Sequence, residues 1–128
     1  MKEFLKNEDL IEAKLNGYAR GFFAADSSGR YLGVTPYQGR EVTGLVFPLH
    51  AEQVPEFLKS ENVPSLYHLE EVSKDIVPLL PYPVFTLVVN KVNYGGKISK
   101  SYIKQIKDGL RMRSYPFREN FLEETPLP

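Results

Sequence analysis

The pattern of hydrophobic and polar residues predicts a chain built mainly of β-strands. Five segments rich in aromatic and β-branched residues are expected to form strands: residues 18–25, 30–37, 42–49, 66–72 and 84–92. The turn sequence at residues 26–29 predicts a hairpin between the first two strands, and a second turn at residues 38–40 precedes the third. Because the last segment is the most strand-like run in the chain, we expect it to be central in the sheet.

Apolar residues at helical spacing predict short helices as well, at residues 3–15, 51–59 and 100–113. Pro55 lies early in the second helix, where its missing N–H has little effect, and Ser99 is a suitable N-cap for the third. The tail, residues 114–128, carries large apolar side chains. We expect it to dock in part on the domain and to be partly disordered at its end.

These elements indicate an α+β fold in a single domain spanning residues 1–128. The composition agrees, because eight Tyr, eight Phe, ten Pro and no Trp are typical of a β-rich core with many turns. A chain of this length can bury about two thirds of its unfolded surface around one core.

Charge and cysteine content exclude several classes of function. Sixteen basic residues balance sixteen acidic ones, so neither a nucleic-acid partner nor a membrane surface is expected. The absence of cysteine excludes disulfides, thiolate metal sites and a cysteine nucleophile. The charged first fifteen residues lack the apolar region of a signal peptide, and no window reaches the length of a membrane span, so a cytoplasmic location is expected.

Glu61 is the strongest candidate for chemistry. It follows the predicted helix at residues 51–59, and Phe57, Val63 and Leu66 are apolar neighbours in the sequence. An apolar environment would raise the pKa of a glutamate from about 4.3 towards neutrality, so that it could both accept and donate a proton. The alternative interpretation is a solvated glutamate at a helix C-terminus.

Other candidate sites receive little support. His50 and His68 are too isolated for a metal site, and His68, close to Glu70 in the sequence, is expected on the strand surface. No Gly-x-Ser-x-Gly elbow is present, which leaves a serine hydrolase unsupported. Cationic residues follow the last predicted helix and indicate a solvated face, with an anionic partner as the weaker alternative: Lys97, Lys100, Lys104, Lys107, Arg111 and Arg113.

Three segments in order resemble known motifs. Gly17-Tyr18 followed by Phe22 is similar to a strand motif G-Y-x-x-x-F. The run Val42-x-Gly44-x-Val46-Phe47, followed by a helix, Glu61 and Tyr67, is similar to V-x-G-x-V/L-Y/F with a downstream glutamate and tyrosine. Residues 99–109 are similar to a closing helix S-x-x-Y-L-x-x-I-x-x-G. Together these motifs resemble the γ-glutamylcyclotransferase-like superfamily, which also holds γ-glutamylamine cyclotransferases and avirulence-induced plant proteins.

The resemblance implies a small, mostly antiparallel β-barrel with two or three short helices and a pocket at one end. It further implies that Glu61 is the catalytic acid/base that cyclises a γ-glutamyl amine or amide to 5-oxoproline. Tyr102, Tyr67 and Gly44 would bind the substrate, and neither cofactor nor metal is implied. A tyrosine on an apolar helix face is, however, more often a core residue with its hydroxyl at the rim, and this is the alternative interpretation of Tyr102.

The chain departs from the family pattern in several places. Family members begin with a strand ending in Y-G-S/T-L/N, whose backbone amides are understood to hold the substrate, and residues 1–15 contain no counterpart. Phe57-Leu58 stands where the family has leucine and aspartate, and Leu69 stands where it has a basic residue.

These departures leave two alternatives to the enzyme. One is a non-catalytic small-molecule binding or interaction module. The other is a subunit whose first strand comes from a partner, with a homodimer covering the open sheet edge.

Overall fold

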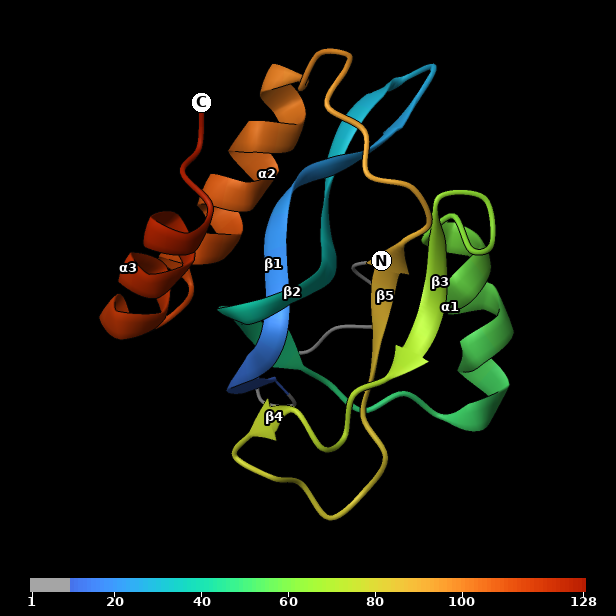
Figure 1. Cartoon of the computed structure of the whole chain (residues 1–128), viewed down its shortest axis with the longest axis vertical. Helices are drawn as coiled ribbons and strands as arrows, with labels where there is room; N and C mark the ends of the chain where they lie inside the picture. The colour runs from blue at the N-terminus through green and yellow to red at the C-terminus, as the bar shows by residue number, and fades with distance from the viewer. Residues whose placement is uncertain (1–9) are drawn as a thin grey trace.

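The computed structural model describes residues 10–128, in which one sheet has the strand order β3-β5-β2-β1-β4 (Figure 1). The strands of this sheet are β1 (Ile11–Asp26), β2 (Gly29–Val46), β3 (Tyr67–Glu71), β4 (Ile76–Val77) and β5 (Phe85–Val89). With three α-helices beside the sheet, the predicted α+β class is confirmed. β3 and β4 lie at the two ends of the strand order, and the predicted closure into a barrel is not confirmed.

The two longest strands form the predicted hairpin. β1 and β2 pair antiparallel from Ile11↔Val46 to Asp26↔Gly29. Asp26 accepts hydrogen bonds from the backbone N–H (2.8 Å) and the hydroxyl (2.6 Å) of Ser28, which is the local bonding that favours aspartate at the start of a tight turn. The hairpin follows directly from its turn chemistry.

The second predicted turn is wrong, because β2 continues through residues 38–40. The ladder shifts register there, since Asn16 pairs with Glu41 whereas Tyr18 pairs with Pro36. Residues 37–40 therefore bulge opposite Gly17, and Gly17 and Gly39 adopt the left-handed φ angles of +85° and +87° that glycine tolerates. Turn-forming residues here bend a strand instead of reversing it.

The first predicted helix is also wrong within the described residues. Ile11 already begins β1, and the remainder of that prediction, residues 3–9, lies outside the described part of the chain. Ala13 and Leu15 are buried, whereas the alternate positions Glu12 and Asn16 are exposed, so the segment has the two-residue period of a strand. Its apolar residues contribute to the core cluster of Ala13, Leu15, Val42, Val72, Ile76 and Val84.

The strands predicted at residues 66–72 and 84–92 are present as β3 and β5. They pair antiparallel over five positions, from Tyr67↔Val89 to Glu71↔Phe85. β5 meets β2 through a single parallel pair, Val34↔Val88, so it has a neighbour on each side as expected, although β2 is the middle strand of the order. The short edge strand β4 was not predicted.

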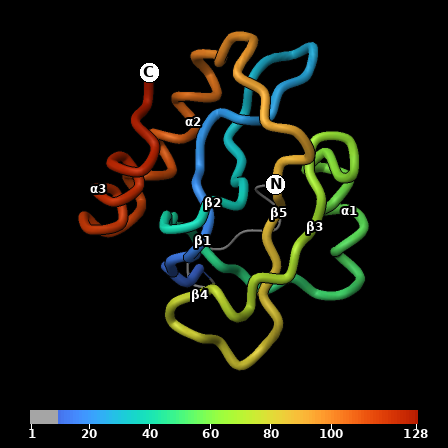
Figure 2. The backbone as a smooth tube through the Cα atoms, viewed as in Figure 1, coloured from blue at the N-terminus to red at the C-terminus, as the bar shows by residue number. Residues whose placement is uncertain are grey.

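The helices lie on opposite flanks of the sheet (Figures 1 and 2). The 3-10 turn η3 (Ala51–Gln53) and α1 (Val54–Ser60) confirm the second predicted helix and lie beside β3. α2 (Lys100–Arg111) confirms the third, and the Ser99 hydroxyl caps it by accepting from the Tyr102 N–H. No helix in the described part of the chain is long and apolar enough to cross a membrane.

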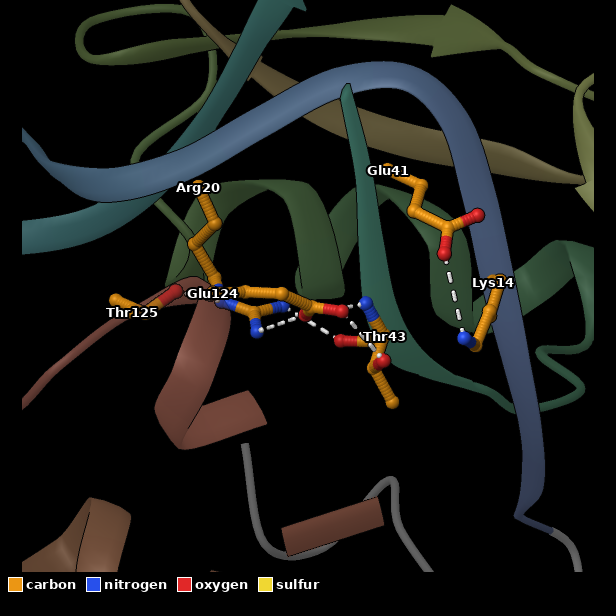
Figure 3. Close-up of polar contacts among 6 residues, drawn as sticks. All are labelled: Lys14, Arg20, Glu41, Thr43, Glu124 and Thr125. Carbon is orange, nitrogen blue, oxygen red and sulfur yellow. Dashed lines mark hydrogen bonds and ion pairs between the residues drawn. The ribbon is translucent and has the colours of Figure 1, made fainter. Parts of the chain in front are cut away.

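The predicted tail contains one further helix, α3 (Tyr115–Glu124), which the sequence pattern did not indicate. Figure 3 shows how its end attaches to the hairpin. Arg20 of β1 donates to Glu124 Oε1 (3.2 Å), Thr125 Oγ1 (3.1 Å) and the Thr43 carbonyl (2.6 Å). The Phe121 ring covers the Arg20 guanidinium at 3.8 Å. This buried network fixes α3 against β1 and β2.

Candidate functional site

Glu61 lies where the sequence predicted it, at the C-terminal end of α1. Its backbone N–H donates to the Phe57 carbonyl (3.0 Å), so the helix itself determines where the side chain begins. The side chain is half-buried, and this burial raises the pKa of its carboxyl. No side chain among residues 10–128 hydrogen-bonds to the carboxylate. Glu61 is therefore a partly desolvated carboxyl whose surroundings favour its protonated form.

A compact turn joins Glu61 to the start of β3. Asn62 has the left-handed φ of 59°, which asparagine tolerates better than most residues, and its carbonyl accepts from the N–H groups of Leu66 (2.9 Å) and Tyr67 (3.3 Å). The Ser65 hydroxyl donates to the same carbonyl at 3.3 Å. These bonds bring the backbone of Tyr67 close to the Glu61 turn.

Two tyrosine hydroxyls contact the backbone of one residue of β2, Leu32. Tyr67 donates its hydroxyl proton to the Leu32 carbonyl (2.7 Å), and the Leu32 N–H donates to the Tyr102 oxygen (3.0 Å). The bond to Leu32 thus uses the proton of Tyr67 but leaves the proton of Tyr102 available to another acceptor. The two phenols are chemically distinct, although the sequence motifs assigned them one role.

The electrostatics indicate that Glu61 and these phenols are neighbours. Burial is the main reason that the pKa of Tyr67 and the pKa of Tyr102 are both raised, and the Glu61 carboxyl raises both further. Tyr31 contributes in the same direction to both phenols, and its ring lies edge-on to that of Tyr102 with centroids 5.4 Å apart. The structure therefore gathers Tyr67, Tyr102 and Tyr31 near Leu32, within electrostatic reach of Glu61.

Sequence reasoning missed Tyr31 and Gly33. Tyr31 reads as an ordinary aromatic residue of a predicted strand, because its partner Tyr102 is far away in the sequence. Gly33 lies beneath Tyr67: a Cβ there would meet Val89 Cγ2 at 2.2 Å and Tyr67 Cε1 at 3.2 Å. A glycine inside a strand is the signal that could have indicated this close approach.

Gly44 is the glycine that the family resemblance implied in substrate binding, and the structure shows no crowding at its position. It pairs with Ala13 towards the other end of β2, and a Cβ built on it would meet nothing within 4 Å beyond its chain neighbours. Packing therefore does not require glycine at this position. Its role in substrate binding stays a prediction.

The described surface hollows lie away from Glu61, so its predicted pocket is not found among them. One follows α2 and is lined by Ile98, Lys100, Ile103, Lys104, Lys107, Asp108, Arg111 and Pro128. The other lies between the hairpin and α3 and is lined by Glu12, Ala13, Lys14, Thr43, Val77, Pro116, Phe117 and Asn120. Within residues 10–128, no group of three or more His, Asp or Glu side chains is placed to hold a metal ion.

The sequence itself matches no family model and no curated protein. Solved structures do match. An uncharacterized human protein aligns with a TM-score of 0.67 at 20% identity, over 98% of this chain and 80% of that one. A structure described as a gamma-glutamyl cyclotransferase aligns with a TM-score of 0.67 at 18% identity, over 98% of this chain and 81% of that one.

YkqA from Bacillus subtilis aligns with a TM-score of 0.66 at 21% identity, over 88% of this chain and 42% of that one. At such identities a structural match establishes the fold. The chain has the γ-glutamylcyclotransferase-like fold.

Proposed function

We propose that this protein cyclises a γ-glutamyl amine or amide to 5-oxoproline, with Glu61 as the general acid/base. The observation that carries the proposal is the half-buried carboxyl of Glu61, whose pKa is raised by burial, beside the phenols of Tyr67 and Tyr102. A carboxyl with a raised pKa is suited to proton transfer near neutral pH. The similarity in fold to a gamma-glutamyl cyclotransferase supports this choice of reaction.

The reaction needs one group that moves a proton twice. The α-amino nitrogen of the substrate attacks its own γ-carbonyl carbon, forming a C–N bond and a tetrahedral intermediate, while Glu61 accepts a proton from that nitrogen. Glu61 then returns the proton to the nitrogen of the departing amine as the original amide C–N bond breaks. The products are 5-oxoproline and a free amine or amino acid, and Glu61 ends in its starting form.

The tyrosines have complementary roles in this proposal. Tyr102 keeps its hydroxyl proton when it accepts from Leu32, so it can donate to the oxygen that becomes negative in the intermediate. Tyr67 has used its proton on the Leu32 carbonyl, so its oxygen can accept from the substrate's amine.

The test is release of 5-oxoproline from a panel of γ-glutamyl amines and γ-glutamyl amino acids. We expect at least one compound to be converted, and Glu61→Gln to lower its conversion at least about 100-fold while the fold is retained. Glu56→Gln is the matched control, because Glu56 is an exposed glutamate of the same helix. A wild-type protein that converts none of the panel would refute the enzyme.

A non-catalytic binding module is the second candidate. It is favoured by the bonds that attach both tyrosine hydroxyls to Leu32 and by the location of the described hollows away from Glu61. Thermal-shift screening of the same panel separates the two functions. A binding module would be stabilised by a compound that it leaves unchanged, and the stabilisation would persist in Glu61→Gln.

A further inference from the structure

Four side chains that the proposed reaction does not use form a hydrogen-bonded row near the turn that carries Glu61. Asn90 Oδ1, just after β5, lies 2.9 Å from His68 Nδ1 in β3. His68 Nε2 lies 3.0 Å from Glu70 Oε1. The other Glu70 oxygen accepts from the Tyr18 hydroxyl of β1, also at 3.0 Å. The row thus links β5, β3 and β1.

The partners of Asn90 determine which atoms carry protons. Its amide nitrogen donates to the carbonyls of Pro64 (2.6 Å) and Ser65 (3.3 Å), so its oxygen must face His68. Nδ1 of His68 must then donate to that oxygen, and Nε2 must donate to the Glu70 carboxylate. Only the doubly protonated, cationic imidazole supplies both protons.

Loss of one proton from His68 disrupts this set of hydrogen bonds between His68 and Asn90. The remaining proton stays on Nε2, because the carboxylate is a stronger acceptor than the Asn90 amide. The bare Nδ1 then faces the oxygen of Asn90, and two acceptors repel each other. Rotation of the amide relieves the repulsion, but it withdraws the Asn90 nitrogen from Pro64 and Ser65.

Those two carbonyls belong to the turn between Glu61 and Tyr67. We propose that His68 and Asn90 are positioning residues for that turn, which His68 holds in its cationic form and releases in its neutral form. The inference rests on the proposed function only for the role of Glu61, since the contacts themselves are independent of any reaction.

The surrounding charges set the direction of the switch. The hydrogen bond to Glu70 is the main reason that the pKa of His68 is raised, followed by the bond to Asn90. Glu70 in turn faces Tyr18, whose pKa is also influenced by Asp75 in the loop before β4. Because the pKa of His68 is raised in the folded chain, His68 is cationic at low pH and Asn90 keeps its hydrogen bonds to the turn. These hydrogen bonds are lost as pH rises through the raised pKa.

A ¹H–¹⁵N NMR titration between about pH 5.5 and 8.5, around the ordinary histidine pKa of about 6.5, tests the inference. We expect the backbone amides of Ser65 and Leu66 to shift with the same midpoint as the His68 ring, and that midpoint to lie above 6.5. His50 is an internal control, because the chain has only two histidines, and His50→Gln should leave the shifts of the turn unchanged.

The variant Asn90→Ala tests whether His68 affects the turn through Asn90 or only because it lies nearby. In this variant His68 still titrates, but the amides of Ser65 and Leu66 should lose the shift that follows it. Turn amides that do not follow His68 in the wild type, or that follow it unchanged in Asn90→Ala, would overturn the inference.

The NMR titration tests the role of His68 and Asn90 whether or not the protein releases 5-oxoproline. Failure of the proposed function is therefore distinguishable from failure of this inference. If the protein is active, its kcat should fall as pH rises through the His68 midpoint. That fall should be absent in Asn90→Ala.

Discussion

Two polar clusters of this molecule differ in how completely their groups are bonded. In the first, at the end of α3, the Arg20 guanidinium donates to Thr43, Glu124 and Thr125. Both oxygens of Glu124 also accept from Thr43, at 2.7 Å from its N–H and 2.8 Å from its hydroxyl (Figure 3). Burial lowers the pKa of Arg20 to about 10, and the neighbouring Glu124 opposes that shift. Each side-chain nitrogen of Arg20 and each carboxylate oxygen of Glu124 thus has a hydrogen-bond partner within the protein.

The second cluster, around Glu61, is only partly bonded. Tyr67 and Tyr102 are attached to Leu32, but the Glu61 carboxylate has no side-chain hydrogen-bond partner among residues 10–128. A satisfied network stabilises a fold, whereas a desolvated group without a partner lowers stability and remains available for chemistry. We therefore ascribe a structural role to the Arg20 cluster, and the proposed function gives the Glu61 cluster a chemical one.

The largest loss of stability is expected at Glu124. Glu124→Ala leaves the Arg20 cation buried without its carboxylate, which should lower the free energy of unfolding by about 3 kcal/mol. Urea denaturation measures this. Glu123→Ala, at an exposed position of the same helix, should change it by less than about 0.5 kcal/mol. Equal effects in the two variants would remove the structural role of the Arg20 cluster.

Glu61→Gln should have the opposite profile, with loss of activity but no loss of stability. Burial raises the pKa of Glu61, so the folded chain binds this proton more tightly than the unfolded chain. The ionisation of Glu61 therefore lowers the free energy of unfolding as pH rises through the glutamate range. Glu61→Gln lacks the ionisable group, so its free energy of unfolding should not contain this decrease. Denaturation at pH values across this range measures it, and a variant less stable than wild type at neutral pH would contradict the assignment.

Substitution of the two strand glycines, Gly33 and Gly44, by alanine should have different effects on stability. Gly33→Ala places a Cβ 2.2 Å from Val89 Cγ2, so overpacking should lower the free energy of unfolding by about 1–3 kcal/mol. Gly44→Ala has open space and should be nearly neutral. Thermal or urea denaturation of the two variants decides which glycine the fold requires, and a strongly destabilising Gly44→Ala would contradict this assignment.

Modest losses of stability are expected at the two tyrosines that contact Leu32. Tyr67→Phe and Tyr102→Phe each remove one bond to Leu32 and should lower the free energy of unfolding by about 1 kcal/mol. Tyr115→Phe, at a side chain that is 66% exposed, is the control. If the protein is active, Tyr102→Phe should slow the reaction more than Tyr67→Phe, because only Tyr102 has a proton to donate. The reverse order would contradict the assigned roles.

The sequence predicted those parts of the molecule that depend on local chemistry. The hairpin follows from Asp26 and Ser28, the α2 start from Ser99, and the position of Glu61 from the end of α1. The start of β1 was misassigned because a short segment of charged and apolar residues matches helical and strand periods almost equally. Tertiary contacts with Val42 and Ile76 decide between them.

The site could be predicted only in part. Motif spacing singled out Glu61, Tyr67 and Tyr102 as candidates, and the pKa shifts are consistent with their being neighbours. Their roles in a reaction stay predictions. Tyr31 and Gly33 were missed because their importance arises from Tyr102 and Tyr67, which only the folded chain brings near. The Arg20 network was missed for the same reason, since Glu124 is distant in the sequence.

The titration of the Glu61 carboxyl itself is the most direct test of the contrast between the two clusters. Carbon-detected NMR of the side-chain carboxyl, followed against pH, gives its midpoint without requiring a substrate. Because burial raises the pKa of Glu61, its carboxyl should titrate above the ordinary glutamate value of about 4.3. A midpoint at or below that value would mean that Glu61 is solvated or paired, and would contradict its proposed role as the acid/base.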